Sequence, residues 1–318
     1  MTRYIINRVI NILPTLLIVA IIVFGVTRIL PGDPAASILG PQANATEIEN
    51  MRIVMGLDKP IWEQFINYLG NLLRGDLGYS YAYNMNVVDL IAERFPNTVI
   101  LTVSALIIAL VVGVPAGILS AYKRNTFVDY LVMVISLVGV SMPVFWLGVM
   151  LVLIFSVNLG WLPATGMGDW SQGADVFFKH LILPSVTLAT IPMANFARIT
   201  RSSMLDVLSQ DYIRTARAKG LLENKVVWKH ALKNALNPIL SVLGMQVASL
   251  LGGSVLTETI FSWPGMGRLV TDAINRGDFG VVQGVVIFIA LIYVVTNLII
   301  DILYKVVNPK ISYEGGGK

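Results

Sequence analysis

Uncharged apolar stretches dominate the chain, and six of them are long enough to cross a membrane. A helix rises 1.5 Å per residue, so about 20 residues span roughly 30 Å of hydrocarbon. The stretches are continuously apolar rather than alternating, which favours helices over the strands of a membrane barrel. The sequence therefore predicts six transmembrane helices, at Val9–Thr27, Thr98–Ala121, Leu131–Val157, Leu181–Ala197, Ala235–Thr257 and Val281–Ile300.

The composition of the chain excludes most other classes of protein. Of its 318 residues, 55% are hydrophobic and only 13% are charged, whereas about 25% are charged in an ordinary soluble domain. A soluble fold of this length cannot bury so much apolar surface, and disordered or nucleic-acid-binding proteins need a different composition. The absence of cysteine excludes disulfides and thiolate metal sites. We therefore predict an all-α polytopic membrane protein.

Lysine and arginine residues indicate how the chain is oriented. Eight of them lie between Arg198 and Lys233, and two more precede the first span, at Arg3 and Arg8. Short cytoplasmic segments are enriched in these residues. The bias places the N-terminus in the cytoplasm, and six crossings return the C-terminus to the same side. No small-x-small cleavage site follows the first span, so we interpret it as a retained anchor rather than a secretory signal.

Four regions follow from this topology. Residues 1–29 form the N-terminal span, 30–97 an extracytoplasmic segment, 98–307 a five-helix core that includes the cytoplasmic segment 207–233, and 308–318 a cytoplasmic tail. The extracytoplasmic segment either packs on the membrane surface or docks a partner, and its pattern leaves both interpretations open.

Short elements are predicted outside the bilayer. Thr46 and Glu49 form a capping-box pattern that opens one short helix. Pro60 begins a second, amphipathic helix. The apolar positions of this second helix are Ile61, Phe65, Leu69 and Leu72. Between the fifth and sixth spans, the residues Trp263-Pro264-Gly265 favour an interfacial re-entrant turn.

The cytoplasmic segment contains a predicted helix, Asp211–Leu222, with an unusual surface. A narrow stripe, made mostly of small side chains, recurs every four residues along it. The stripe consists of Leu208, Tyr212, Ala216 and Gly220. Arg214, Arg217 and Lys219 point elsewhere. Such a helix suits a groove on another protein, and an interfacial helix held by anionic lipid is the alternative.

The spans give little sign of a built-in energy source, although sodium coupling through the backbone carbonyls of unwound helices stays open. Their apolar cores contain no ionisable residue, which disfavours a built-in proton relay. No phosphate-binding loop is present, and the two histidines, His180 and His230, fall at opposite membrane faces, so we predict no catalytic residue and no metal site. The polar residues Ser141, Asn195 and Gln246 are candidates for lining a pathway, with interhelical hydrogen bonds as the alternative.

Motifs along the whole chain carry a resemblance to a known family. The residues Arg214-Thr215-Ala216 and Gly220 stand at the E-A-A and glycine positions of the coupling motif of ATP-binding-cassette (ABC) importer permeases. Five longer segments match as well: Leu30–Pro34, Gly56–Pro60, Leu73–Gly78, Asp211–Gly220 and Leu256–Gly265. Together they resemble the B-type permease of the dipeptide, oligopeptide and nickel importers, in which an arginine-threonine variant of the coupling motif is usual.

The resemblance implies a type I ABC importer permease (MetI-like) fold in a bacterial or archaeal cytoplasmic membrane. It also implies three kinds of protein partner: a homologous C-type permease subunit, two ABC ATPase subunits and an extracytoplasmic solute-binding protein. Membrane lipid is a further partner, predicted from the apolar spans. ATP and Mg would be bound by the ATPase subunits, and this chain would hold no cofactor. The coupling residues implied by the motif are Asp211, Tyr212, Arg214, Thr215, Ala216, Arg217 and Gly220.

The substrate implied by the resemblance is a di- or oligopeptide. Members of the branch also import nickel or metal chelates, glutathione and haem, and no residue of this chain discriminates among these solutes. A self-sufficient secondary carrier or channel is the alternative from a different class of protein. An intramembrane enzyme has no candidate residues in this sequence.

Overall fold

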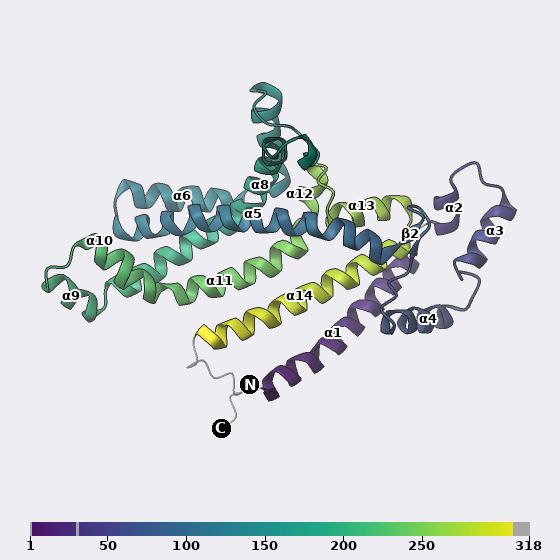
Figure 1. Ribbon diagram of the computed structural model, residues 1–318, viewed down its shortest axis with the longest axis horizontal. Coiled ribbons are helices and arrows are strands. Elements are labelled where there is room, and N and C mark those ends of the chain that lie inside the picture. The colour runs from purple at the N-terminus through teal and green to yellow at the C-terminus, as the bar shows by residue number, and fades with distance from the viewer. Residues whose placement is uncertain (1, 30–31, 308–318) are drawn as a thin grey trace. The chain divides into compact units, whose positions relative to one another are not determined.

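The computed structural model describes residues 2–29 and 32–307, and the predicted tail 308–318 lies outside this range. Long helices form most of the structure (Figure 1). They are α1 (Thr2–Ile29), α5 (Val87–Tyr122), α6 (Phe127–Ser141), α8 (Ala174–Leu208), α11 (Leu232–Gly253) and α14 (Phe279–Val307), and the short α7 (Val144–Leu151) follows α6. All-helical architecture was the prediction, and the structure confirms it.

Shorter elements connect the long helices. Those before α5 are α2 (Pro34–Leu39), α3 (Ala45–Val54), α4 (Ile61–Leu73) and the antiparallel pair β1 (Tyr79–Ser80) and β2 (Met85–Asn86), in which Tyr79 faces Asn86. Those after it are α9 (Asp211–Ala218), α10 (Glu223–Lys225), α12 (Val255–Ile260), α13 (Met266–Arg276), a 3-10 turn at Trp170–Gln172 and two π-helices, η1 (Val152–Asn158) and η3 (Val226–Ala231).

Five of the six predicted spans correspond to single apolar helices. Within the described residues, five helices are long and apolar enough to cross a membrane, and a bent pair brings the number to six if it counts as one span. The five are Ile12–Ile29, Val87–Tyr122, Ala174–Leu208, Glu223–Gly252 and Phe279–Ile300.

The third predicted span, Leu131–Val157, is not one helix. It divides into Phe127–Ser141 and Val144–Asn158, which are bent by 104° relative to each other. The break falls at Pro143, which lacks a backbone N–H, and the preceding Met142 takes the extended conformation (φ −74°, ψ 131°) that a following proline favours. The sequence pattern missed the break because the hydrophobic run continues through it.

One local prediction is corrected by hydrogen bonds, and one helix was missed. The capping box of α3 is formed by Asn44 and Glu47, each accepting from the other's backbone N–H at 2.9 Å, and not by Thr46 and Glu49. The Asn side chain stands at the residue that precedes the helix, where an acceptor satisfies the free N–H groups. After the turn at Trp263, the chain forms the helix α13 (Met266–Arg276), which the sequence pattern did not predict.

The chain divides into two compact units, which we describe separately. The N-terminal unit comprises Met1–Thr98 and Trp263–Val295, and the central unit comprises Val99–Ser262 and Thr296–Lys318. In the N-terminal unit, residues of α5, α13 and α14 form the apolar core. This core contains Val87, Leu90, Ile91, Met266, Leu269, Ala273, Val281, Val282 and Val285. Sequence-distant segments are therefore held together by burial.

Hydrogen bonds add to this core at two places. The indole of Trp263 donates to the backbone carbonyl of Asn97 at 2.9 Å, and the Asn97 side chain donates to the carbonyl of Pro264 at 2.9 Å. The buried carboxylate of Asp278 accepts from the hydroxyl of Ser80 at 2.5 Å, which joins the β1–β2 hairpin to the start of α14. These contacts satisfy polar groups that burial would otherwise leave unpaired.

The central unit is built around α8, which packs against α6 and α11. Glycines allow α5 and α6 to approach it closely. A Cβ at Gly117 of α5 would lie 2.5 Å from the carbonyl oxygen of Ala197, and one at Gly139 of α6 would lie 3.3 Å from the Thr190 side chain. Small residues at such contacts let helix backbones pack closely in a membrane, where dispersion supplies much of the association energy.

Candidate functional site

The predicted cytoplasmic segment forms one end of the central unit. Figure 1 shows α9 and α10 at the point where α8 ends and α11 begins. Helix α9 spans Asp211–Ala218, so it is shorter than the predicted Asp211–Leu222. The chain then turns at Gly220 and continues through α10 and the π-helix η3 into α11. Single-turn π-helices inside longer helices are frequent at functional sites.

Gly220 ends α9 through a Schellman motif. Its φ is +75°, in the left-handed region that residues with a Cβ rarely adopt. The Gly220 N–H donates to the carbonyl of Arg217 at 2.9 Å, and the Leu221 N–H donates to that of Ala216 at 3.4 Å. This pairing satisfies carbonyls that the helix end would leave free. A Cβ at Gly220 would meet nothing within 4 Å, so the conformation, and not crowding within the chain, requires glycine here.

One face of α9 is buried against the rest of the central unit. Ile213 is fully buried and Ala216 nearly so. They belong to an apolar cluster formed with residues of α5, α8, η3 and α11. The other buried members are Ile118, Ala121, Met204, Val226, Val227, Ala231 and Ala235. Helix α9 is therefore packed on the ends of the spanning helices rather than tethered only by its loops.

The predicted small-residue stripe does not lie on a single face. Ala216 points into the chain, whereas Tyr212 and Gly220 are exposed, because the packing stripe passes through Ile213 instead. The hydroxyl of Tyr212 accepts a hydrogen bond from the Asn234 side chain at 2.8 Å, which ties α9 to the start of α11. Asp211, Tyr212, Arg214 and Thr215 form the outer surface of α9.

The basic residues of the segment differ in their partners and in their exposure. Arg217 makes two hydrogen bonds to the Glu223 carboxylate, at 2.7 and 3.1 Å, which hold the end of α9 to α10. The pKa of Arg217 is raised by these hydrogen bonds. Arg214 pairs with Asp211 at 3.2 Å, with both side chains largely exposed. Arg217 therefore stabilises the fold of the segment, whereas Arg214 and Lys219 present positive charge to the surroundings.

An ion pair with a buried carboxylate holds α8 to the start of α6. The Asp129 carboxylate, whose side chain is 2% exposed, accepts from Arg201 at 2.6 and 2.8 Å. It also accepts from the hydroxyl of Ser120 at 2.5 Å and from the backbone N–H of Asn125 at 2.9 Å. Arg201 lies about two helical turns before the end of α8 at Leu208. The cluster thus sets the position of the helix from which α9 extends.

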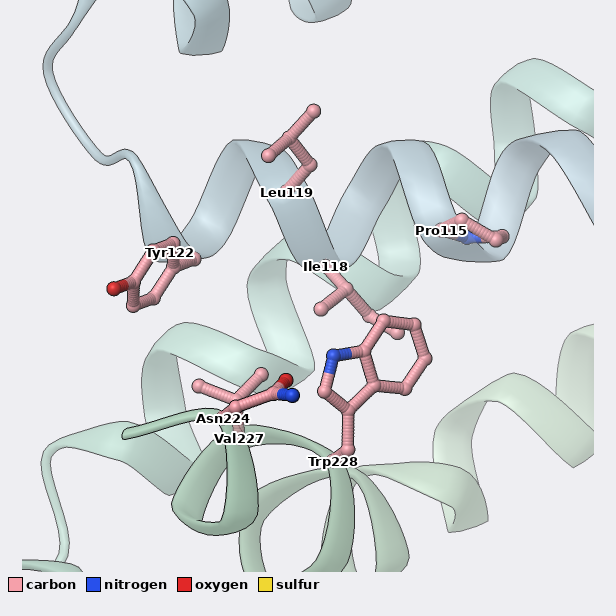
Figure 2. A pocket seen from close by; sticks show the side chains of 7 residues that line it. All are labelled: Pro115, Ile118, Leu119, Tyr122, Asn224, Val227 and Trp228. Carbon is pink, nitrogen blue, oxygen red and sulfur yellow. The ribbon is translucent and has the colours of Figure 1, made fainter. Parts of the chain in front are cut away.

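A small pocket lies beside this segment, between α5 and η3 (Figure 2). Its volume is about 190 Å³. The indole of Trp228 covers one side, next to Ile118. The remaining lining residues are Pro115, Leu119, Tyr122, Asn224 and Val227. The walls are mainly apolar, and the arrangement offers no pair of groups suited to acid–base or nucleophilic chemistry.

The three candidate pathway residues lie on different helices of the central unit. Ser141 is exposed at the end of α6, whereas Asn195 of α8 and Gln246 of α11 are half-buried. Among the described residues, none of their side chains makes a hydrogen bond. Their role in a pathway stays a prediction. No group of three or more His, Asp or Glu residues that could hold a metal ion occurs in the described ranges.

Comparison with known proteins agrees with this arrangement. A family described as "Binding-protein-dependent transport system inner membrane component" matches residues 113–313, and its N-terminal counterpart matches residues 1–102. The glutathione transport system permease protein GsiC of Escherichia coli O6:H1 is 45% identical over 314 residues, covering 99% of this chain and 100% of that protein. The dipeptide transport system permease protein DppB of Alkalihalophilus pseudofirmus is 45% identical over 333 residues, covering 98% and 100%.

A solved structure shares the fold. The inward-facing MetNI methionine ABC transporter, in its CY5 native crystal form, aligns with a TM-score of 0.55 and 20% identity, covering 69% of this chain and 95% of that chain. Fold and sequence together define a multi-pass permease of the bacterial inner membrane, which is not itself an enzyme. The chain belongs to the binding-protein-dependent transport system inner membrane component family. It carries no cofactor, and ATP is bound by a partner ATPase.

Sequence reasoning missed several residues that position α9. Ile213 is the one large apolar side chain of that helix apart from Tyr212, and this isolation was the available signal. The hydrogen bond between Asn234 and Tyr212 joins residues 22 apart. The Asp129–Arg201 pair joins residues 72 apart and has no local signature. Long-range pairs of this kind are visible only in the folded chain.

Substitutions at Gly220 can show whether glycine is required for its backbone conformation or for the close approach of a partner. We expect Gly220→Val to destabilise the end of α9 by about 1–2 kcal/mol, because β-branched residues disfavour a positive φ, and Gly220→Asn to cost less. The measurement is solute uptake per ATP hydrolysed by the reconstituted importer. Uptake per ATP should fall for the valine variant and stay close to normal for asparagine. Equal losses in both would instead indicate that a partner approaches the Cα of Gly220 closely.

Proposed function

We propose that this chain is one of two permease subunits of an ATP-driven importer of di- or oligopeptides. It forms half of the translocation pathway together with a homologous C-type subunit. Two ABC ATPase subunits bind its cytoplasmic face, and a solute-binding protein delivers peptide from outside. The relatives named for dipeptide and for glutathione transport are equally similar to this chain. Since glutathione is itself a peptide derivative, a peptide-like solute is the class that both support, and glutathione is the second candidate.

The mechanism that we propose assigns the coupling role to α9. Its inner face, Ile213 and Ala216, is packed into the central unit, and its ends are tied by Tyr212–Asn234 and Arg217–Glu223. A force applied to the outer face is therefore transmitted to α8, α11 and α5 rather than absorbed by a loose loop. Closure of the ATPase subunits around the outer residues Asp211, Tyr212, Arg214 and Thr215 would move the bundle as a lever.

The observation that carries this proposal is that one face of α9 is buried within the chain, whereas the opposite face is exposed. An interfacial helix held by lipid would be expected to turn its apolar side chains towards the membrane. Here the large buried side chain, Ile213, is instead packed within the chain.

Reconstitution tests both the energy source and the solute. We expect uptake of a labelled dipeptide into proteoliposomes to require the complete importer, ATP at the ATPase side and the binding protein at the other. Replacing ATP with a non-hydrolysable analogue is the control. Excess unlabelled dipeptide should compete more effectively than glutathione, and the reverse order would favour the second candidate. Flux through the chain alone without ATP would contradict the proposal and favour a self-sufficient carrier.

A further inference from the structure

Helix α4, in the segment between α1 and α5, has an apolar stripe that the described residues of the N-terminal unit leave largely exposed. The stripe consists of Trp62, Ile66, Leu69 and Leu73, which recur at helical spacing and lie within roughly 60° of one another around the axis. The exposed fractions are 65% for Trp62, 58% for Ile66 and 88% for Leu73. Water is a costly environment for such a row of large apolar side chains.

A second face of α4 packs on the spanning helix α1. The ring centroid of Phe65 lies 5.1 Å from that of Phe24, and the ring of Tyr68 stacks on Phe24 with centroids 5.7 Å apart. Phe24 is buried and lies inside the membrane-spanning stretch Ile12–Ile29. Phe24 stands five residues, or about 7.5 Å of helix, before the end of this candidate span, so α4 contacts α1 near the end of the span. This depth corresponds to the headgroup and outer acyl region of a leaflet.

The third face of α4 is polar and lies away from the stripe. It carries Glu63, Asn67 and Asn71, and Glu63 pairs with Lys59 at 2.8 Å. Asn67 and Asn71 are exposed, as are Trp62, Ile66 and Leu73 of the apolar stripe, whereas Leu69 is half-buried. An apolar stripe that includes a tryptophan, opposite a polar face and at interfacial depth, is the arrangement of a helix lying in a membrane surface.

We propose that α4 is an interfacial anchor, with Trp62, Ile66 and Leu73 inserted among the lipids of the leaflet next to segment 30–97. The orientation prediction makes this the extracytoplasmic leaflet. Lipid is the occupant because α1 itself exposes Ile22, Val26 and Ile29 at the same level, and these must be covered by lipid or by another membrane helix. The anchor would fix the height of α3 and the hairpin above the membrane. It does not depend on which solute the importer carries.

Spin labels at single cysteines provide the test, because the native chain contains no cysteine. Labels at 62, 66 and 73 report the stripe, and labels at 67 and 71 on the same helix are matched controls. The assembled importer in proteoliposomes is measured by power saturation with oxygen, which partitions into lipid, and with a water-soluble nickel chelate. We expect the stripe labels to be accessible to oxygen and at least several-fold less accessible to the chelate, with the opposite ranking at 67 and 71.

Two other results would overturn the proposal. Equal access of the nickel chelate to both faces would show that α4 stands in water. Protection of the stripe labels from both reagents would show that another subunit covers them. ATP hydrolysis by each labelled importer is measured in parallel, so that only assembled and active samples are compared.

Discussion

We expect replacement of Ile213 by aspartate to abolish ATP-dependent uptake while the chain still assembles in the membrane. Ile213 is fully buried beneath α9, and burial of an isoleucine side chain contributes about 1.5–3 kcal/mol. An unpaired carboxylate in the same place adds a desolvation penalty. A helix as short as α9 is not stable by itself, since its stability comes from the packed face. The helix should therefore detach, and a detached helix cannot transmit a force.

Two measurements separate detachment from general misfolding. Trypsin should cleave at Arg214 and Arg217 at least tenfold faster in the Ile213→Asp importer, because both bonds become part of a mobile segment. Uptake should be lost while the spanning helices remain protected. Gln210→Asp is the matched control, because it introduces the same charge at the exposed residue before α9, where a carboxylate is favourable. Normal uptake by the Ile213→Asp importer would contradict the lever role of α9.

The second large effect is expected at the Asp129–Arg201 pair. Replacing Arg201 with methionine leaves the Asp129 carboxylate buried without its cation, although Ser120 and the Asn125 N–H still donate to it. Loss of one partner of a buried pair costs about 3–5 kcal/mol. The double variant Asp129→Leu/Arg201→Met should recover part of this loss, because it leaves no buried charge. Its recovery is partial because Ser120 and Asn125 lose their acceptor.

Thermal unfolding of the purified importer measures this prediction. The apparent midpoint should fall most for Arg201→Met and less for the double variant. Lys179→Met is the control on the same helix, because Lys179 pairs with Asp175 at the surface, with side chains 56% and 69% exposed. Exposed pairs of this kind contribute about 0–1 kcal/mol. A double variant no more stable than Arg201→Met would contradict the importance of the unpaired carboxylate.

Much of the fold is predictable from the hydrophobic pattern. Five spans were located correctly because an uninterrupted apolar run in a membrane must become a helix, whatever surrounds it. The amphipathic helix that begins after Pro60 was also predicted, because the spacing of its apolar residues is a local property. The third span was predicted as continuous although Pro143 lies in it. A proline in an apolar run can kink, break or be accommodated, and only the packing around it decides which.

The coupling segment was likewise predictable from the sequence only in part. Its charge, its position between two spans and its motif were visible in the sequence, and they led to the correct family. The face of α9 that is buried against the rest of the chain was not visible in the sequence. The four-residue spacing suggested a stripe through Tyr212, Ala216 and Gly220, whereas the packed face passes through Ile213 and Ala216. A helix of eight residues has several possible apolar faces, and the one that is buried depends on the surface against which it packs.

The sequence by itself determined that this protein crosses a membrane, that its apolar spans lack the ionisable residues of a proton relay, and to which family it belongs. These properties depend on composition, on runs of neighbouring residues and on short motifs. Only the tertiary structure decided that α6 and α7 are bent at Pro143, that Asp129 and Arg201 meet, and that α9 rests on Ile213. Those outcomes depend on contacts between residues far apart in the chain, and the burial that stabilises such contacts exists only once the helices have packed.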